Sequence, residues 1–215
     1  VNKYRQEGKK IFFMTNNSTK SRKQIWEKLT GMGLKCSYDE VYTSGYAAAL
    51  YAKQMGYHTV YIMGSKALEE EFGELDITVS DQAEVVIVGY DMAFDYQKLT
   101  DALQVAFHAD KIIACNKERH YPGENAKRMP GCGAMVGALE GSLGRAVDYS
   151  VGKPNPLLME IICKDNDLRP EEVVVVGDTY ESDIVMAQNY GSSSVYIGEE
   201  DHKDIKCIHA IGELL

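Results

Sequence analysis

Short, uninterrupted runs of valine and isoleucine recur along the chain and alternate with segments of helical periodicity. The two clearest runs are EVVIVG at 84–89 and EVVVVG at 172–177. Strands that are apolar on both faces are typical of parallel sheets, because helices cover both faces of such a sheet. The pattern therefore predicts an α/β fold with a parallel sheet, in which ligands bind at the carboxyl ends of the strands.

The same criteria place the remaining elements. Shorter apolar runs predict strands at 10–14, 41–43, 59–63, 111–115 and 194–197, the last strand of the chain. Apolar residues at helical spacing predict helices at 19–32, 46–55, 66–72, 96–107, 133–141, 155–165 and 183–190. The stretch 116–130 is rich in charge, glycine and proline, and is predicted to be irregular.

Composition argues against several classes of function. Hydrophobic residues make up 45% and charged residues 26% of the 215 residues, the balance of an ordinary globular protein. With a formal net charge of −9 and no basic stripe, binding to a nucleic-acid polymer is not expected. The apolar runs are only a few residues long, so neither a signal peptide nor a membrane span is expected. The five cysteines form no CxxC pair, which favours a reduced, cytoplasmic compartment.

The motif GDTYESD follows the strongest predicted strand and carries two carboxylates. Asp178 comes directly after the strand, and Asp183 opens the next helix five residues later. A purely structural interpretation makes Asp183 or Ser182 a helix N-cap and places Asp178 in a turn. That interpretation explains Asp178 poorly, because a carboxylate next to a buried strand is costly unless it is paired. Two converging carboxylates suit a hard divalent cation such as Mg²⁺.

Two further features carry polar groups that suit an anion. The strand at 10–14 ends in Thr15-Asn16-Asn17-Ser18, where Ser18 or Thr19 is a good helix N-cap. A hydroxyl and backbone N–H groups beside a helix N-terminus also bind phosphate oxygens. Lys153 lies in VGKPNP, which is either a surface lysine in a proline-rich turn or a fixed ammonium that neutralises phosphate.

The order of these motifs resembles the haloacid-dehalogenase (HAD) superfamily, and most closely its NagD-like and nitrophenyl-phosphatase subgroup. Thr15 matches the second motif of that family, Lys153 the third, and Asp178 and Asp183 the fourth. The flanking sequences KKIFFMTNNSTKSR, TSGYAAALY, YPGENAKRMPGCGA and VGKPNPLLME agree as well. The resemblance extends over about residues 7–197, nearly the whole chain.

The resemblance implies a Mg²⁺-dependent phosphatase with a HAD-type Rossmann-like core at 1–57 and 147–215 and an inserted α/β cap at 58–146. Family members form an aspartyl-phosphate on an aspartate from a DxDGT motif. By this resemblance, Thr15 and Lys153 are catalytic, and Asp178 and Asp183 hold the metal. Substrate-binding roles fall to the asparagines of the two loops, Asn16, Asn17 and Asn155.

The sequence departs from the family at its nucleophile, because no DxDGT occurs in the 215 residues. The triplet Asp165-Asn166-Asp167 has DxD spacing, but a predicted helix precedes it and no strand does. The chain begins inside the helix that normally follows the motif. We therefore expect the nucleophile and its strand to lie upstream of these residues. The end of the chain after 197 is also shorter than is usual in the family.

The resemblance also assigns a role to the loop at 114–134 within the cap. In relatives the corresponding loop reaches the active site and selects the leaving group, which points to Glu118 and Tyr121, with Asn116 supporting the loop. The alternative is a solvated surface loop that makes no substrate contact. The expected substrate is a small phosphorylated metabolite, such as a sugar phosphate or a nucleotide. A homodimer formed through the cap is also expected.

Two other functions stay open. One is a truncated chain or pseudophosphatase that is inactive and only binds phosphate or Mg²⁺. The other is an unrelated doubly wound binding domain of the response-regulator type. Such a domain would need neither an inserted cap nor the TNNS turn, so it agrees least with the sequence.

Overall fold

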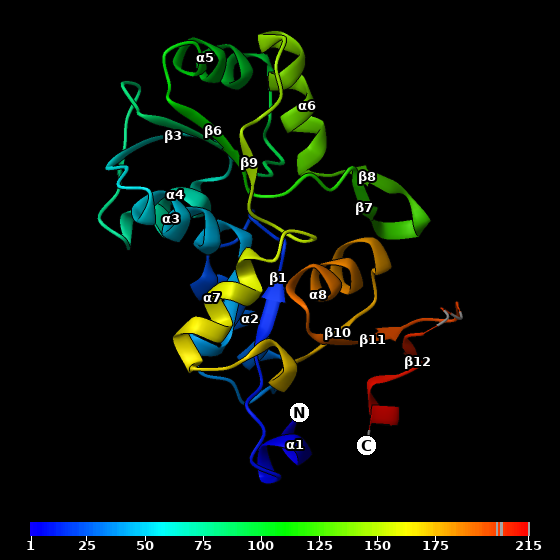
Figure 1. The fold of residues 1–215 in the computed structure, drawn as a ribbon. Helices are drawn as coiled ribbons and strands as arrows, with labels where there is room; N and C mark the ends of the chain where they lie inside the picture. The colour runs from blue at the N-terminus through cyan, green and yellow to red at the C-terminus, as the bar shows by residue number, and fades with distance from the viewer. Residues whose placement is uncertain (201, 203, 215) are drawn as a thin grey trace. The chain divides into compact units, whose positions relative to one another are not determined.

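The computed structural model of the chain describes residues 1–200, 202 and 204–214 (Figure 1). The chain forms two compact units, Val1–Val151 and Gly152–Leu215. The first unit contains a five-stranded sheet, a two-stranded parallel sheet and a two-stranded hairpin. The second unit contains a three-stranded sheet.

The five-stranded sheet is parallel throughout, as the continuous apolar runs predict. Its strands lie in the order β4 (Thr78–Val79), β3 (Thr59–Met63), β5 (Val85–Val88), β6 (Lys111–Ala114) and β9 (Tyr149–Ser150). In the centre, Val86 of β5 pairs with Tyr61 of β3 and Ile112 of β6. The carboxyl ends of β3, β5 and β6 therefore lie along one edge of the sheet.

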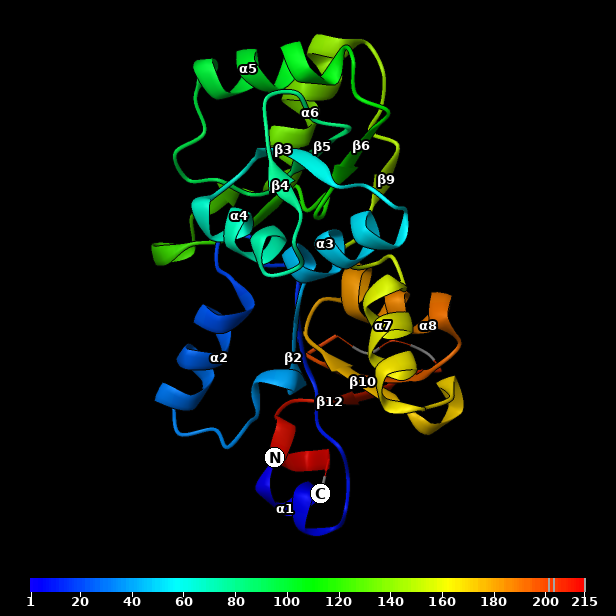
Figure 2. The same ribbon diagram turned by 90° about the vertical axis from the view of Figure 1, so that its left-hand side faces the viewer.

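Helices cover both faces of this sheet. Figures 1 and 2 show α5 (Tyr96–Ala106) and α6 (Cys132–Leu143) on one side and α3 (Ser44–Gln54) and α4 (Lys66–Gly73) on the other. On the first side, Val86 and Val88 share a core cluster with residues of α5 and α6. The neighbouring Val85 and Ile87 point to the opposite side and are equally buried. Burial on both faces explains why no polar residue interrupts the run.

The two-stranded sheet joins β1 (Phe13–Thr15) and β2 (Val41–Thr43) in parallel. The same unit includes α1 (Asn2–Gln6), α2 (Arg22–Gly31) and the short 3₁₀ helix η1 (Tyr38–Glu40). The predicted N-cap at Ser18 or Thr19 is wrong, because Ser21 caps α2 in a reciprocal pair of hydrogen bonds with Gln24. The glutamine three residues after the cap is the signal that favours Ser21.

The segment predicted to be irregular contains a short antiparallel hairpin. Strands β7 (His120–Pro122) and β8 (Arg128–Pro130) pair across the 3₁₀ turn η2 (Glu124–Ala126). Asn125 adopts a left-handed conformation in that turn, which asparagine tolerates better than most residues. The pairing was missed because each strand has three residues, most of them exposed, and so carries no apolar periodicity.

The second unit forms a parallel sheet in the order β10 (Val174–Gly177), β11 (Ser193–Ile197) and β12 (Lys206–Ile208). β11 was predicted as the last strand of the chain, but β12 follows it. The apolar signal of β12 is weak because only Ile208 is buried. The helices of the unit are α7 (Leu157–Asn166), η3 (Pro170–Glu172), the π-helical turn η4 (Tyr180–Ile184), α8 (Val185–Tyr190) and η5 (Ile211–Leu214).

The prediction that β10 is buried on both faces is wrong for this structure. Val175 is buried, but Val174 is 55% exposed and Val176 is 37% exposed. β10 is also the end strand of its sheet, so its outer edge pairs with no strand that the structure describes. One face and one edge of β10 are therefore left without a cover among the described residues.

A buried charge cluster joins α2 to α4 in the first unit. The guanidinium of Arg22 lies 4.2 Å from the ring centre of Tyr46 and 4.5 Å from that of Tyr38, both within cation–π range. Its Nε donates a hydrogen bond to the carbonyl of Val41 at 2.6 Å. The carboxylate of Glu71, which is only 2% exposed, accepts a hydrogen bond from the main-chain N–H of Arg22.

Burial dominates the ionisation of Glu71. It raises the pKa of the carboxyl to about 7, although the hydrogen bond from Arg22 and the nearby guanidinium act in the opposite direction. One of its carboxylate oxygens has no hydrogen-bond partner among the described residues. Burial therefore makes the charged form of Glu71 less stable in the folded chain than it would be in water.

We predict that Glu71→Gln makes stability less sensitive to pH. The folded pKa of about 7 lies above the ordinary value of 4.5, so the contribution of protonated Glu71 is complete below pH 4.5 and is lost as pH rises through 7. The loss amounts to about 3 kcal/mol. Urea unfolding between pH 4.5 and 8 should show this decline in the parent protein and a flatter profile in the variant.

Glu69, an exposed residue of the same helix, offers the matched control for this experiment. Glu69→Gln should leave the pH profile of the parent protein unchanged. Parallel profiles for the parent and Glu71→Gln would contradict the raised pKa.

Candidate functional site

The turn after β1 has the geometry of a loop that can hold an anion. The hydroxyl oxygen of Thr15 accepts a hydrogen bond from the main-chain N–H of Asn17 at 3.1 Å. The side-chain oxygen of Asn17 accepts hydrogen bonds from the N–H groups of Thr19 and Lys20, at 2.9 and 3.1 Å. The Thr15 hydroxyl keeps its own proton for a further acceptor, because it is the acceptor in the bond from Asn17.

Asn16 is buried, and three side chains from other parts of the first unit bind it. Its carbonyl oxygen accepts hydrogen bonds from Ser44 Oγ and Asn116 Nδ2, each at 2.8 Å. Its side-chain Nδ2 donates to Oε1 of Glu118 at 2.9 Å. Asn16, Asn116 and Glu118 were all predicted as site residues, and the structure brings these three into direct contact.

Ser18 ties the other end of the turn to the edge of the five-stranded sheet. Its hydroxyl accepts a hydrogen bond from the main-chain N–H of Tyr90 at 2.8 Å. Its carbonyl accepts one from Ser65 Oγ at 3.1 Å. Ser65 follows β3 and Tyr90 follows β5, so the turn is held by the carboxyl ends of two parallel strands.

Tyr121 lies on β7 and its hydroxyl is 2.8 Å from that of Tyr90. The two rings meet edge to face, with their centroids 5.6 Å apart. Burial and the bond to Tyr121 raise the pKa of Tyr90 to about 12. Tyr90 therefore stays protonated at neutral pH, and one of the two hydroxyls donates to the other.

The second unit holds the other predicted polar residues. Lys153 Nζ lies 2.6 Å from Oδ1 of Asp183, and the two side chains are only 12% and 9% exposed. The second oxygen of Asp183 accepts a hydrogen bond from the N–H of Thr179 at 3.2 Å. The purely structural interpretation of Asp183 or Ser182 as a helix N-cap is wrong, because neither η4 nor α8 has a side-chain cap. The peptide bond between Lys153 and Pro154 is cis.

Gly177 explains how Asp183 reaches the end of β10. A Cβ atom at Gly177 would lie 2.3 Å from the Cβ of Asp183 and 2.5 Å from its Oδ2. Only glycine leaves room for this approach, so the glycine at the end of the strand has a steric cause. Asp178, the next residue, is exposed and makes no hydrogen bond with the residues that the structure describes.

Asn155, also in the second unit, was predicted to bind substrate. Its side-chain oxygen accepts a hydrogen bond from the N–H of Leu157, at the first residue of α7, at 2.9 Å. This bond gives Asn155 a structural role at the start of the helix. Its role in substrate binding stays a prediction.

The donor set of Asp178 and Asp183 fits Mg²⁺. The described residues contain no cluster of three or more histidine, cysteine or acidic side chains that could hold a metal. Mg²⁺ does not need such a cluster, because it is usually bound by one or two carboxylates together with waters and substrate phosphates. No described residue bonds the carboxylate of Asp178, and Asp183 has both oxygens engaged by Lys153 and Thr179.

Two buried cysteines near the turn are poor candidates for a nucleophile. Cys115 directly follows β6 and Cys132 begins α6. Burial raises the pKa of the Cys132 thiol to about 12 and holds that of Cys115 well above its usual range. Because the thiolate is the reactive form, both groups are inert at neutral pH.

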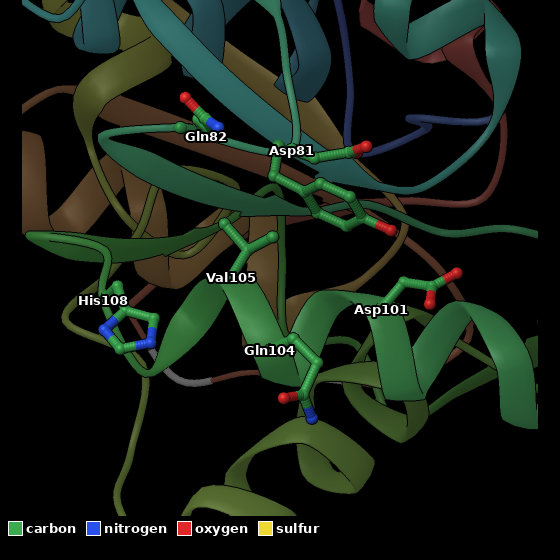
Figure 3. A pocket seen from close by; sticks show the side chains of 8 residues that line it. Asp81, Gln82, Asp101, Gln104, Val105 and His108 are labelled. Carbon is green, nitrogen blue, oxygen red and sulfur yellow. The ribbon is translucent and has the colours of Figure 1, made fainter.

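A hollow of about 620 Å³ lies elsewhere in the first unit, between Tyr61 of β3, the 81–83 segment and one face of α5 (Figure 3). The carboxylates of Asp81 and Asp101 line it. The predicted site residues are absent from its lining, and its two carboxylates disfavour an anion. The hollow is therefore not the predicted phosphate site.

Sequence reasoning missed the residues that hold the turn in place, namely Ser44, Ser65 and Tyr90. Tyr90 carried a usable signal, because it directly follows a predicted buried strand, where ligand sites of parallel sheets lie. Ser44 and Ser65 are single hydroxyls in ordinary helix-start positions. Only the three-dimensional arrangement identifies them.

No helix within residues 1–200, 202 and 204–214 is long and apolar enough to cross a membrane.

Comparison with known proteins gives matches to one family. A family model described as haloacid dehalogenase-like hydrolase matches residues 1–78, and a HAD-hydrolase-like model matches residues 150–210. The chain is 32% identical over 197 residues to the sugar-phosphatase AraL of Bacillus subtilis, a match that covers 90% of this chain and 72% of that protein.

Solved structures agree in fold. A p-nitrophenyl phosphatase from Archaeoglobus fulgidus matches with a TM-score of 0.87 and 30% identity, over 99% of this chain and 81% of that one. A 4-nitrophenylphosphatase from Thermotoga maritima matches with a TM-score of 0.91 and 26% identity, over 98% of this chain and 85% of that one.

The Lys153–Asp183 pair leads to a prediction about stability. Lys153→Met should destabilise the protein by roughly 3 kcal/mol, because it leaves a buried carboxylate without its partner. The double variant Lys153→Met/Asp183→Asn should recover part of that loss. Urea unfolding at pH 7 measures both effects.

The half-exposed pair of Lys117 and Glu140, with 2.8 Å between Nζ and Oε1, provides the control. Lys117→Met should cost less than about 1 kcal/mol, as is usual for solvated ion pairs. Equal losses for the two lysine variants would mean that burial does not strengthen the Lys153–Asp183 pair.

Proposed function

Since this chain belongs to the haloacid dehalogenase-like hydrolases, we propose that it hydrolyses small phosphomonoesters, with sugar phosphates as the first class to test, in a Mg²⁺-dependent reaction. The HAD fold and the phosphatase class, both predicted from the motifs, are confirmed by the similarity to known phosphatases. The metal, the substrate and the roles of individual residues are the proposal.

The observation that carries the proposal is the arrangement at the end of β10. A buried ion pair of Lys153 and Asp183 lies against Gly177, directly beside the exposed carboxylate of Asp178. A structural ion pair alone would not need an unpaired carboxylate next to it. Asp178 and Asp183 would hold Mg²⁺, with Asp183 oriented by Lys153 and Thr179. The metal, when bound, neutralises charge on the phosphoryl oxygens.

The residues of the chain supply further stabilisation of the phosphoryl group. The hydroxyl proton of Thr15 is available to a phosphoryl oxygen, and the turn that carries it is held by Asn17. Lys153 adds a fixed positive charge with little freedom to move. Donors that are fixed before the reaction stabilise charge as it develops, at no cost in reorganisation. Asn16 supports the turn through its contacts with Ser44 and Asn116.

The nucleophile in this proposal is an aspartate outside the 215 residues, which forms an aspartyl-phosphate that water hydrolyses. Two features of β10 support the proposal that another strand packs there. Its outer edge pairs with no described strand, and Val174 and Val176 are exposed. An apolar strand with an open edge is a suitable partner for an additional parallel strand.

We propose that the loop leading into the hairpin contacts the leaving group of the substrate. We propose that Glu118 and Tyr121 contact it, that Asn116 supports the loop, and that Asn155 contributes from the start of α7. The sugar-phosphatase name of AraL and the nitrophenyl-phosphatase names of the structural neighbours favour small phosphomonoesters of differing leaving group.

The remaining expectations extend the proposal to the whole molecule. We propose that residues 1–57 and 147–215 form the core and residues 58–146 the cap. A homodimer through the cap and a cytoplasmic location belong to the same proposal. Size-exclusion chromatography with light scattering would test the dimer.

The metal assignment is tested by Asp178→Asn. In the natural full-length protein, this variant should lose Mg²⁺-dependent release of phosphate from p-nitrophenyl phosphate, roughly 100-fold or more. The matched control is Asp165→Asn, an exposed aspartate of α7, which should keep full activity. Full activity in Asp178→Asn would refute the metal assignment. A parent protein that hydrolyses no phosphomonoester would refute the proposed function itself.

A further inference from the structure

Tyr90 makes two connections that lead to different parts of the predicted site. Its main-chain N–H donates to the hydroxyl of Ser18 in the turn after β1, at 2.8 Å. Its side-chain hydroxyl bonds that of Tyr121 on the hairpin, also at 2.8 Å. A single residue therefore links the proposed phosphate-binding turn to the proposed leaving-group loop.

The ring of Tyr90 is held by packing in the core of the first unit. It packs against the core cluster between the five-stranded sheet and the helices α5 and α6. Directly after it, the N–H of Asp91 contacts the sulfur of Met135 on α6 at 3.3 Å, and Asp91 is paired with Lys98 of α5. The backbone at Tyr90 is thus fixed by β5 on one side and by two helices on the other.

The hairpin, in contrast, has few contacts that fix its direction. Its base is closed by main-chain bonds from Gly131 to Arg119 and from Gly133 to Glu118, at 2.9 and 2.8 Å. A Cβ at Gly131 would lie 2.3 Å from the carbonyl oxygen of Glu118, so the base is tightly packed. Beyond the base, β7 and β8 are made of exposed and half-buried residues. Within β7, Tyr121 bonds Tyr90, which packs against the core cluster.

We propose that Tyr90 is a positioning residue, which holds the β7–β8 hairpin at a fixed distance from the TNNS turn and thereby sets the leaving groups that the enzyme accepts. This inference rests on the proposed phosphatase function. Tyr90 does not touch the substrate in this proposal. It acts through Tyr121, because its side-chain hydroxyl makes the hydrogen bond to the Tyr121 hydroxyl.

The consequence for catalysis is specific to the leaving group. In this proposal the turn after β1 holds the phosphoryl group. Tyr90 supports that turn through its main-chain N–H, and a substitution of the Tyr90 side chain leaves this N–H in place. Loss of the Tyr90 hydroxyl should therefore weaken binding of substrates that reach the hairpin. Substrates too small to reach it should be unaffected. Weaker binding of this kind raises KM and leaves kcat nearly unchanged.

The first test measures the hairpin directly and needs no activity. Hydrogen exchange of the amides at 120–130 should be between about twofold and tenfold faster in Tyr90→Phe, the range expected for the loss of one hydrogen bond. Tyr121→Phe should give the same increase. The double variant should add little to either one, because both remove the same bond.

Tyr96→Phe is the control, since Tyr96 is 84% exposed at the start of α5. It should leave exchange of the hairpin unchanged. Unchanged exchange in Tyr90→Phe, or additive effects of the two substitutions, would overturn the proposal.

The second test separates positioning from general stability. In the natural full-length protein, Tyr90→Phe should raise KM for p-nitrophenyl phosphate about threefold or more and leave kcat within about twofold. KM for methyl phosphate should stay at the parent value. An equal change for both substrates, or no change for either, would overturn the role in specificity. Absence of hydrolysis by the parent protein would refute the proposed function, whereas the exchange test would still decide whether Tyr90 holds the hairpin.

Discussion

Parallel pairing of strands whose two faces are both buried is the constraint on which this structure depends. In the first unit it brings the carboxyl ends of β3, β5 and β6 to one edge of the sheet. The polar groups that must be satisfied at that edge are Ser65, Tyr90 and Asn116, and two of these bond Ser18 while the third bonds Asn16. The TNNS turn is therefore held by the same geometry that buries the sheet.

In the second unit, a buried ion pair lies at the carboxyl end of a strand. Lys153 and Asp183 are buried together, and the absence of a side chain at Gly177 allows Asp183 to lie against the strand. The whole chain has a net charge of −9, so an anionic substrate gains nothing from the overall field. In the proposed function, binding comes instead from local groups, for which we propose the Thr15 hydroxyl, the Lys153 ammonium and a cation held by Asp178.

The sequence predicted the parts of the fold whose signal is apolar and local. The runs at 84–89 and 111–115 became adjacent parallel strands, and the motif residues Lys153 and Asp183 are in contact. Elements with weak apolar content were missed, among them β12 and the hairpin. Ser21 was passed over as the cap because Ser18 stands closer to the strand. The raised pKa of Glu71 and the bond between Tyr90 and Tyr121 depend on packing between elements distant in sequence, which no local pattern contains.

The open side of β10 has a consequence for the life of the protein in the cell. Among the described residues, no strand pairs with the outer edge of this valine-rich strand. A strand with an open edge is a template on which another chain can pair, and such segments promote aggregation when they are exposed during synthesis. In the proposed enzyme, the strand that delivers the nucleophile would cover this edge. Pairing of that strand with β10 would then complete the active site and protect the edge from aggregation in a single step. A chain that fails to complete its sheet would keep this edge exposed, and partly folded chains of that kind are the ones on which chaperones and proteases act.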